Sequence, residues 1–419
     1  MGLYIGILIV LISIYNYISA NRNITFNVMF PLYWGVICIL VSIPFQGYSV
    51  VDDAIYVMVL FGVLCFIIGY NFGKKYRIVF FRRLEEKPYI INENVINLVF
   101  AFLFIIFIIL DLNVIKLVRS GSTFSRIRYT QMDKVLNSYL IAAIYKFLAS
   151  PLLTAFIIAF FSDVASRKRI NKRLFAMTLI LTIMEFIAIF DRKYLLLWIA
   201  GVACLLFVFR KNFPVSFRKK LLKIGIILCA LIIGVIYVRG GKIFESIYTY
   251  LTGGLRYFSV RREEYSGLTY GMASLQGIFR PILGILERIN IKWKLFEDAS
   301  DFLMDNQNTA IYINYSRKVY LNYFTTCFAY FFKDLGWLGV VLMPFLWGIL
   351  AGRSSRIMIK GNVDSKSIGL YILLTYSILF SMMNNLFCEV SFAWGVIFFC
   401  LFFVGKCKDN KNYWKRGII

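Results

Sequence analysis

The stretch VINLVFAFLFIIFIILDL, Val95–Leu112, holds a single ionisable side chain, Asp111. A helix needs about 20 predominantly apolar residues to cross the hydrocarbon core of a bilayer, so this stretch predicts a membrane-spanning helix. Similar runs recur along the chain, in which 60% of the 419 residues are hydrophobic, 16% are charged and the mean hydropathy is +0.73. A soluble domain does not have such a composition. We therefore expect an all-α, polytopic integral membrane protein.

The apolar runs predict about eleven spans. They lie near 2–20, 28–45, 54–72, 95–112, 138–161, 174–190, 194–209, 221–238, 335–351, 367–385 and 391–405. The expected organisation is a transmembrane bundle over 1–238 with an additional loop at 113–137, a large loop over 239–334, three more spans within 335–405 and a basic tail over 406–419. Apolar residues at helical spacing, as in SLQGIFRPILGILERI (Ser274–Ile289), predict short or amphipathic helices in the large loop.

Basic residues set the expected orientation. Lysine and arginine exceed aspartate and glutamate by 25, and they concentrate near 74–87, 167–173, 210–223, 353–366 and 406–416. These segments fall on one side if every span crosses, and the positive-inside rule makes that side cytoplasmic. The N-terminus and the loops 113–137 and 239–334 are then outside, and the C-terminus is cytoplasmic. No basic stripe has the spacing of a nucleic-acid motif, so we expect no nucleic-acid partner.

The sequence lacks the residues that several kinds of catalytic and metal site require. Histidine is absent, and the eight cysteines form no C-x-x-C pair. His-based catalysis is therefore excluded, and neither a zinc site nor a disulfide framework is supported. The GGK at Gly240–Lys242 lacks the upstream Gly and the Ser/Thr of a phosphate-binding loop. We expect no cofactor and no metal, and a reaction, if there is one, that is driven by an activated substrate.

The stretch TGGLRYFSVRREEYSGLTYG, Thr252–Gly271, gathers charge and aromatic rings in the large loop. Guanidinium groups hold phosphate oxygens bidentately, and rings such as those of Tyr257 and Tyr270 can stack on sugars. Alternatively, the arginines bind lipid headgroups or pair with Glu263 and Glu264, and the rings belong to an interfacial belt.

Six ionisable side chains lie within or at the ends of predicted spans: Asp111, Lys146, Glu185, Asp191, Arg192 and Lys193. Charged side chains at membrane depth are costly, and they indicate function by default. Lys146 and Glu185 can serve such a function, or they can simply pair with each other.

Five segments then suggest a family. They are RSGSTFSRIRYTQ (Arg119–Gln131), FDRKYLLLWIAGV (Phe190–Val202), TYLTGGLRYF (Thr249–Phe258), SGLTYGMASLQGIFRPI (Ser266–Ile282) and VYLNYFTTCFAYFFKDLGWLGVVLMPFLWGIL (Val319–Leu350). In this order they resemble the external-loop patterns of bacterial oligosaccharide repeat-unit polymerases, the Wzy-type O-antigen and capsule polymerases. Arg128, Arg192, Asn322 and Asp334 fall on those patterns.

The resemblance implies a glycosyltransferase of the bacterial cytoplasmic membrane. Its donor and acceptor would be polyprenyl-pyrophosphate-linked oligosaccharides, and a flippase and a chain-length regulator would be its partners beside the membrane lipids. Pyrophosphate would be held by Arg128, Arg192, Arg256 and Arg280, and the substrate also by Tyr257, Tyr270 and Asn322. Because histidine is absent, the base for the acceptor hydroxyl would be Glu263, Glu264 or Asp334.

Two alternatives stay open. One is a flippase or transporter of lipid-linked oligosaccharides, which should distribute charges through many spans, whereas these charges concentrate in the loops. The other is a metal-dependent glycosyltransferase that uses the Asp52–Asp53 pair in an early external loop, for which sensitivity to a chelator would be diagnostic.

Overall fold

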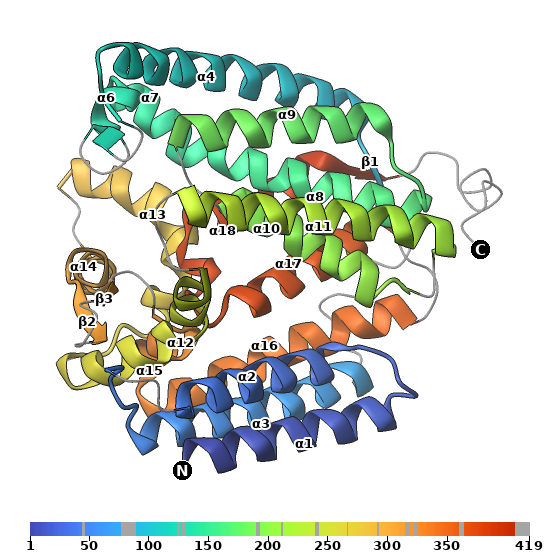
Figure 1. Ribbon diagram of the computed structural model, residues 1–419, viewed down its shortest axis with the longest axis vertical. Coiled ribbons are helices and arrows are strands. Elements are labelled where there is room, and N and C mark those ends of the chain that lie inside the picture. Colours follow the sequence, from blue (N-terminus) through green and yellow to red (C-terminus); the bar gives the residue numbers. More distant parts are fainter. Residues whose placement is uncertain are drawn as a thin grey trace. The chain divides into compact units, whose positions relative to one another are not determined.

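The computed structural model describes residues 1–43, 47–76, 89–123, 126–127, 131–189, 193–210, 213–238, 243–265, 267–290, 293–314, 319–321, 325–359 and 364–406. The described chain is mostly helical, and a helix occupies most of each predicted span (Figure 1). Among the described residues, five helices are long and apolar enough to cross a membrane: α1 (Gly2–Ser19), α3 (Asp53–Lys75), α4 (Glu93–Arg119), the continuous helix Tyr139–Arg167, and α16 (Trp337–Ile359). The expected class, a helical membrane protein, is confirmed at this level.

Six further helices coincide with the other predicted spans. They are α2 (Phe26–Ser42), α9 (Lys172–Ile189), α10 (Lys193–Phe207), α11 (Val215–Val238), α17 (Ser365–Phe380) and α18 (Val390–Phe398).

Contacts divide the chain into two compact units. Unit 1 contains Met1–Arg82, Ile233–Lys360 and Leu374–Glu389, and unit 2 contains Arg83–Ile232, Gly361–Leu373 and Val390–Ile419. The units do not follow chain order. The segment 239–334 packs with the first three helices in unit 1, and the C-terminal spans are shared between the units. Most of the basic tail, from residue 407 onward, lies outside the described residues.

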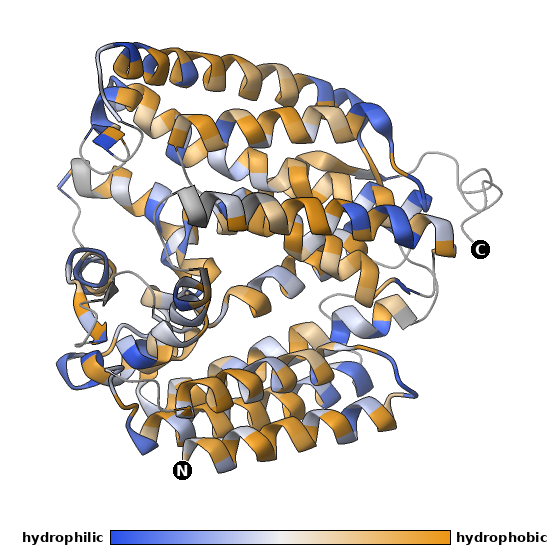
Figure 2. Ribbon diagram, in the orientation of Figure 1, coloured by the Kyte–Doolittle hydropathy of each residue, from blue (hydrophilic) through white to orange (hydrophobic). Residues whose placement is uncertain are grey.

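Unit 1 contains two parallel helices in direct backbone contact. A Cβ atom at Gly69 of α3 would lie 2.1 Å from the carbonyl oxygen of Phe345 in α16, and one at Gly73 would lie 2.2 Å from that of Ile349. The contacts advance in the same direction along both helices, so α3 and α16 run parallel. Small residues permit such close approach in membrane proteins. Figure 2 shows apolar residues along most of both helices.

The first two helices of unit 1 form an antiparallel pair. Gly6 of α1 and Gly35 of α2 face each other, since a Cβ atom on either one would lie 3.0 Å from the carbonyl oxygen of the other. Ser13 Oγ donates to the carbonyl oxygen of Val28 at 2.8 Å. This bond satisfies a hydroxyl that no water reaches in the pair's interior.

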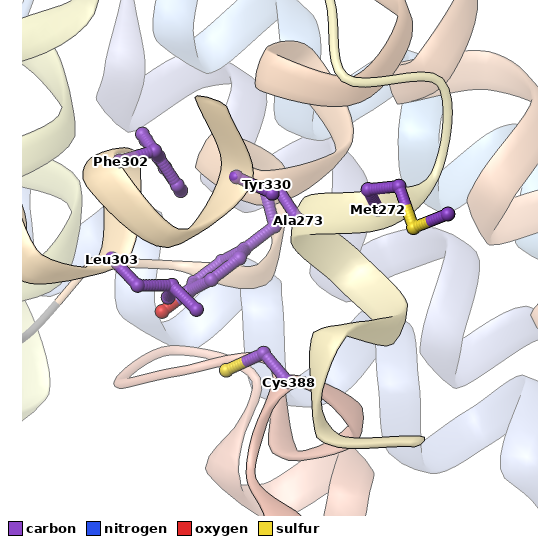
Figure 3. Packing of buried hydrophobic residues seen from close by; sticks show 7 residues of the cluster. Met272, Ala273, Phe302, Leu303, Tyr330 and Cys388 are labelled. Atoms are coloured by element: carbon purple, nitrogen blue, oxygen red, sulfur yellow. The ribbon is translucent and has the colours of Figure 1, made fainter. Parts of the chain in front are cut away.

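The large loop folds into its own set of elements within unit 1. In order these are α12 (Ile243–Arg261), a 3₁₀ turn (Arg262–Glu264), α13 (Met272–Arg288), α14 (Lys294–Asn308), β2 (Ile311–Asn314), β3 (Val319–Leu321) and α15 (Cys327–Leu335). Short helices were expected, but the antiparallel β2–β3 pair was not. Figure 3 shows Tyr330 of α15 among Phe302 and Leu303 of α14, Ala273 of α13 and Cys388.

Unit 2 is built from α4, α6 (Met132–Leu136), α7 (Tyr139–Ile144), α8 (Ser150–Arg167), α9, α10, most of α11 and α18. One turn of π-helix, Tyr145–Ala149, joins α7 to α8. There the Tyr145 hydroxyl donates to the buried carboxylate of Glu185 at 3.0 Å. Beyond the spans, β1 (Tyr89–Ile91) pairs antiparallel with β4 (Val404–Lys406).

Candidate functional site

Polar and charged side chains from two distant segments meet at the N-terminal end of α3. Asp52 Oδ1 accepts a bond from the backbone amide of Ala54 at 3.1 Å and so caps α3. Its other oxygen, Oδ2, lies 3.0 Å from Arg262 Nη2, and its own amide donates to Ser259 Oγ at 2.9 Å. Residues more than 200 positions apart are thus joined at the end of a helix that can span the membrane.

Arg261, the residue before Arg262, makes two ionic contacts of its own. The Arg261 guanidinium is almost fully buried, with Nε 2.6 Å from Glu264 and Nη2 bonded to Asp305 of α14. Asp305 also accepts from Thr309 Oγ1 at 2.9 Å. This arrangement fixes the end of α12 against α14. We refer to Asp52, Arg261, Arg262, Glu263, Glu264 and Asp305 together as the charged cluster.

The two glutamates of the charged cluster have different surroundings. The Glu264 side chain is 58% exposed and is held by Arg261. The Glu263 side chain is 85% exposed, and its nearest cation, Arg262 Nη2, is 3.9 Å away. An exposed carboxylate beside a guanidinium can accept a proton while the cation attracts an anionic oxygen. Of the three predicted bases, Glu263 is therefore the one whose geometry leaves it most available.

Asp334, the third predicted base, is completely buried at the N-terminus of α13. Oδ1 accepts from Thr269 Oγ1 at 2.6 Å and from the Ala273 amide at 2.9 Å, and Oδ2 accepts from the Ser274 amide at 3.0 Å. Burial raises the pKa of this carboxyl above its usual value, although the same hydrogen bonds oppose the rise. Asp334 thus supplies from another helix the cap that α13 lacks in its own sequence.

Arg256, predicted to bind pyrophosphate, lies in the buried middle of α12. Its Nη2 donates to the Val41 carbonyl at 2.9 Å and to Tyr248 Oη at 3.0 Å, and its Nη1 donates to the Ser49 carbonyl. The guanidinium carbon lies 5.1 Å from the centre of the Tyr48 ring. Val41 is in the last turn of α2, where a cation offsets the helix dipole. Within the described chain, no carboxylate forms an ion pair with Arg256.

Of the two rings predicted to stack on sugars, one is buried and one is exposed. The Tyr257 ring is fully buried, and its hydroxyl donates to the carbonyls of Asn306 at 3.3 Å and Thr309 at 3.1 Å. Tyr270 is 64% exposed and has a left-handed backbone, with φ at 50°. Its amide donates to the Asp334 carbonyl at 2.9 Å. Tyr270 is the ring that a ligand can reach.

Arg280 differs from the buried Arg256 and Arg261 and from Arg262, which pairs with Asp52. It lies on α13, is partly exposed, and forms no ion pair with a described residue. The remaining predicted ligands, Arg128, Arg192 and Asn322, lie outside the described residues, as do Gly240–Lys242.

The early aspartate pair also has defined contacts. Asp52 is bound to Arg262 and to the start of α3, and Asp53 lies 3.8 Å from the α-amino group of Met1. No group of three or more His, Cys, Asp or Glu residues within the described ranges is arranged to hold a metal ion.

Two contributors to the site escaped prediction. Asp305 sits among other acidic residues of α14, and nothing in its spacing distinguishes it. Tyr48 lies next to the predicted Asp52–Asp53 pair, but its contact with Arg256 depends on a fold that brings positions 48 and 256 together.

No family model, no curated protein and no solved structure matches the chain.

Proposed function

We propose that this protein is a polysaccharide polymerase that joins polyprenyl-pyrophosphate-linked oligosaccharide repeat units by glycosyl transfer. The observation that carries the proposal is the charged cluster, in which an exposed Glu263 carboxylate and the Arg262 guanidinium lie at the end of a helix able to span the membrane. A lipid-linked substrate presents its pyrophosphate and sugars at that depth.

The proposed side of the membrane follows from the basic residues. Helix α3 begins at the charged cluster and ends with Lys74 and Lys75, and the parallel helix α16 carries Arg356 in its last turn. If the basic ends are cytoplasmic, the charged cluster faces the outside. Eleven spans, an external N-terminus and a cytoplasmic C-terminus in the bacterial cytoplasmic membrane complete this arrangement.

In the proposed reaction, a hydroxyl oxygen of the acceptor sugar attacks the anomeric carbon of the donor. The bond between that carbon and the pyrophosphate oxygen breaks, and polyprenyl pyrophosphate leaves with the bonding electrons. Glu263 accepts the hydroxyl proton, so charge and atoms balance. Negative charge grows on the leaving oxygen, and nearby guanidinium groups stabilise it. We assign that task to Arg262 and Arg280, together with Arg128 and Arg192 from the resemblance.

The remaining predicted residues either contact the sugar or hold the fold of the site. Tyr270 and Asn322 contact sugar. Tyr257, Arg256 and Asp334 hold the elements that carry the reacting groups, since their polar atoms are bonded inside the protein. Donor and acceptor are the partners, with membrane lipids around them and a flippase and chain-length regulator nearby.

Single glutamate variants test the site. We expect Glu263→Gln to shorten the glycan or abolish elongation, because general-base catalysis contributes roughly 10²- to 10⁴-fold. Glu264→Gln should act mainly through the Arg261 contact and retain elongation. Asp301→Asn, on the exposed side of α14, is the matched control. The reading is wrong if Glu263→Gln gives the same chain lengths as Asp301→Asn.

The same experiment separates the alternatives. A flippase would leave lipid-linked units inside the cell in any inactive variant. A metal-dependent enzyme would lose activity when Asp53, which has no part in the charged cluster, is replaced by Asn, and also when a chelator is added.

A further inference from the structure

The first half of helix α13 turns its polar residues toward the protein. Amphipathic helices of soluble proteins bury the apolar face and expose the polar one. In α13, Gln276 and Gly277 are buried, and Gln276 Nε2 donates to Ser300 Oγ of α14 at 2.6 Å. A Cβ atom at Gly277 would lie 2.6 Å from the backbone of Phe387 and of Glu389.

The apolar face of α13 is the exposed one. Leu275, Ile282 and Ile285 share one face at helical spacing, and Ile289 continues that line just beyond the helix. The two middle side chains are 53% and 65% exposed, and that of Ile289 is 62% exposed. Phe279, at the edge of this face, packs against the small core of unit 1 that contains Met272 and Ala273. We call Leu275, Ile282, Ile285 and Ile289 the apolar stripe.

The helix is anchored mainly by its first half. Asp334 caps its N-terminus, and the Ser274 carbonyl accepts from Asn385 Nδ2 at 3.1 Å. Pro281 lacks an amide hydrogen and weakens the hydrogen-bond ladder at the middle of the helix. At Gly284, on the face opposite the stripe, nothing lies within 4 Å of an added Cβ. The second half of α13 therefore has open space beside Gly284.

The length of α13 excludes an ordinary span. Its 17 residues cover about 25 Å, whereas the hydrocarbon core is about 30 Å thick. A row of isoleucines facing water would be a large exposed apolar patch. A protein already embedded in a bilayer offers another environment for that row, the acyl chains next to it.

We propose that α13 lies in the membrane interface and that the apolar stripe contacts the acyl chains of the surrounding lipids. The polar face then holds the folded loop, and the lipid side anchors it at the membrane surface. This places the segment between α12 and α15 at a fixed depth, independently of what reaction the protein performs.

Site-specific photocrosslinking tests the proposal in the full-length protein. p-Benzoylphenylalanine is introduced singly at Ile282 and Ile285, and the protein is reconstituted in vesicles of phosphatidylethanolamine and phosphatidylglycerol. Leu98 of α4, 73% exposed in a candidate span, is the positive control. Gly284, on the same helix but the opposite face, is the matched negative control. Lipid adducts are quantified by mass spectrometry after irradiation.

We expect positions 282 and 285 to form acyl-chain adducts at a yield similar to that at position 98 and severalfold above that at position 284. Adducts to protein segments at 282 and 285 would overturn the proposal and would identify another part of the chain as the cover of the stripe. Adducts to neither lipid nor protein would overturn it as well, because the stripe would then face water. Adduct formation at position 98 in the same preparation verifies that the protein is inserted.

Discussion

Replacement of Asp334 by Asn separates a structural role from a catalytic one. In the variant, the remaining carbonyl can still accept from Thr269 and Ala273 as Oδ1 does now, but the new amide group faces the Ser274 amide, which Oδ2 accepts at 3.0 Å. Two donors then meet, and one buried amide loses its acceptor. Such a loss costs about 1 to 3 kcal/mol, partly offset because a buried charge is removed.

Thermal unfolding of the purified protein in detergent measures this cost. We expect Asp334→Asn to lower the midpoint of unfolding relative to wild type, and Asp301→Asn, at an exposed position of the neighbouring helix, to leave it unchanged. Elongation of lipid-linked repeats should fall only as far as the folded fraction falls. If Asp334→Asn unfolded at the wild-type temperature and nevertheless abolished elongation, Asp334 would act on the substrate and the structural role would be wrong.

Three further perturbations follow from the same contacts. Gly69→Ala should destabilise the protein by about 1 to 3 kcal/mol because the new methyl group meets the Phe345 carbonyl, whereas Gly234→Ala, with no atom within 4 Å, should be neutral or stabilising in the same unfolding assay. Arg261→Gln should release Asp305 and Glu264 and increase proteolysis at the end of α12, which equal cleavage of variant and wild type would contradict. Burial raises the pKa of Tyr257 to about 12 from an unfolded value of 10.0, so the stability gained by keeping this phenol neutral is complete below pH 10 and is lost between pH 10 and 12. Tyr257→Phe should therefore reduce the alkaline loss of stability, and an unchanged pH profile would count against this.

Local sequence patterns predicted the helices well. Each predicted span coincides with a helix because a long apolar run has few other ways to satisfy its backbone in a bilayer. The pattern did not indicate that Tyr145–Ala149 forms a π turn, since the hydrogen-bond register of one helical turn depends on its neighbours. Nor did it predict the β2–β3 pair, whose strands are short and carry no hairpin dipeptide.

The candidate site was less predictable because its contacts are non-local. The pairing of Arg261 with Glu264 follows from a spacing of three residues on a helical turn, and it was weighed as an alternative. The approach of Asp52 to Arg262 depends on how α12 packs against α2 and the residue that caps α3, which no local pattern contains. The same holds for Arg256 and Asp334, which have charged side chains in a segment expected outside the membrane yet bond to backbone groups.

Burial distinguishes arginines of the large loop that hold the fold from arginines that can bind a substrate. Arg256 is a buried cation whose donors are taken by carbonyls and a phenol, whereas Arg280 is partly exposed and has no ion-pair partner among described residues. Only the second can change partners without a cost to folding. Arg280→Ala should accordingly affect elongation more than stability, and Arg256→Ala the reverse.

The most direct test of the central claim is the size distribution of the surface glycan after deletion of the gene. The proposed polymerase activity predicts that long chains disappear while single repeat units accumulate on the lipid at the outer face or reach the surface. Restoration of long chains by the wild-type gene, but not by Glu263→Gln, would tie that loss to the charged cluster. Persistence of long chains in the deletion strain would contradict the account, and repeat units trapped on the cytoplasmic face would identify a flippase instead.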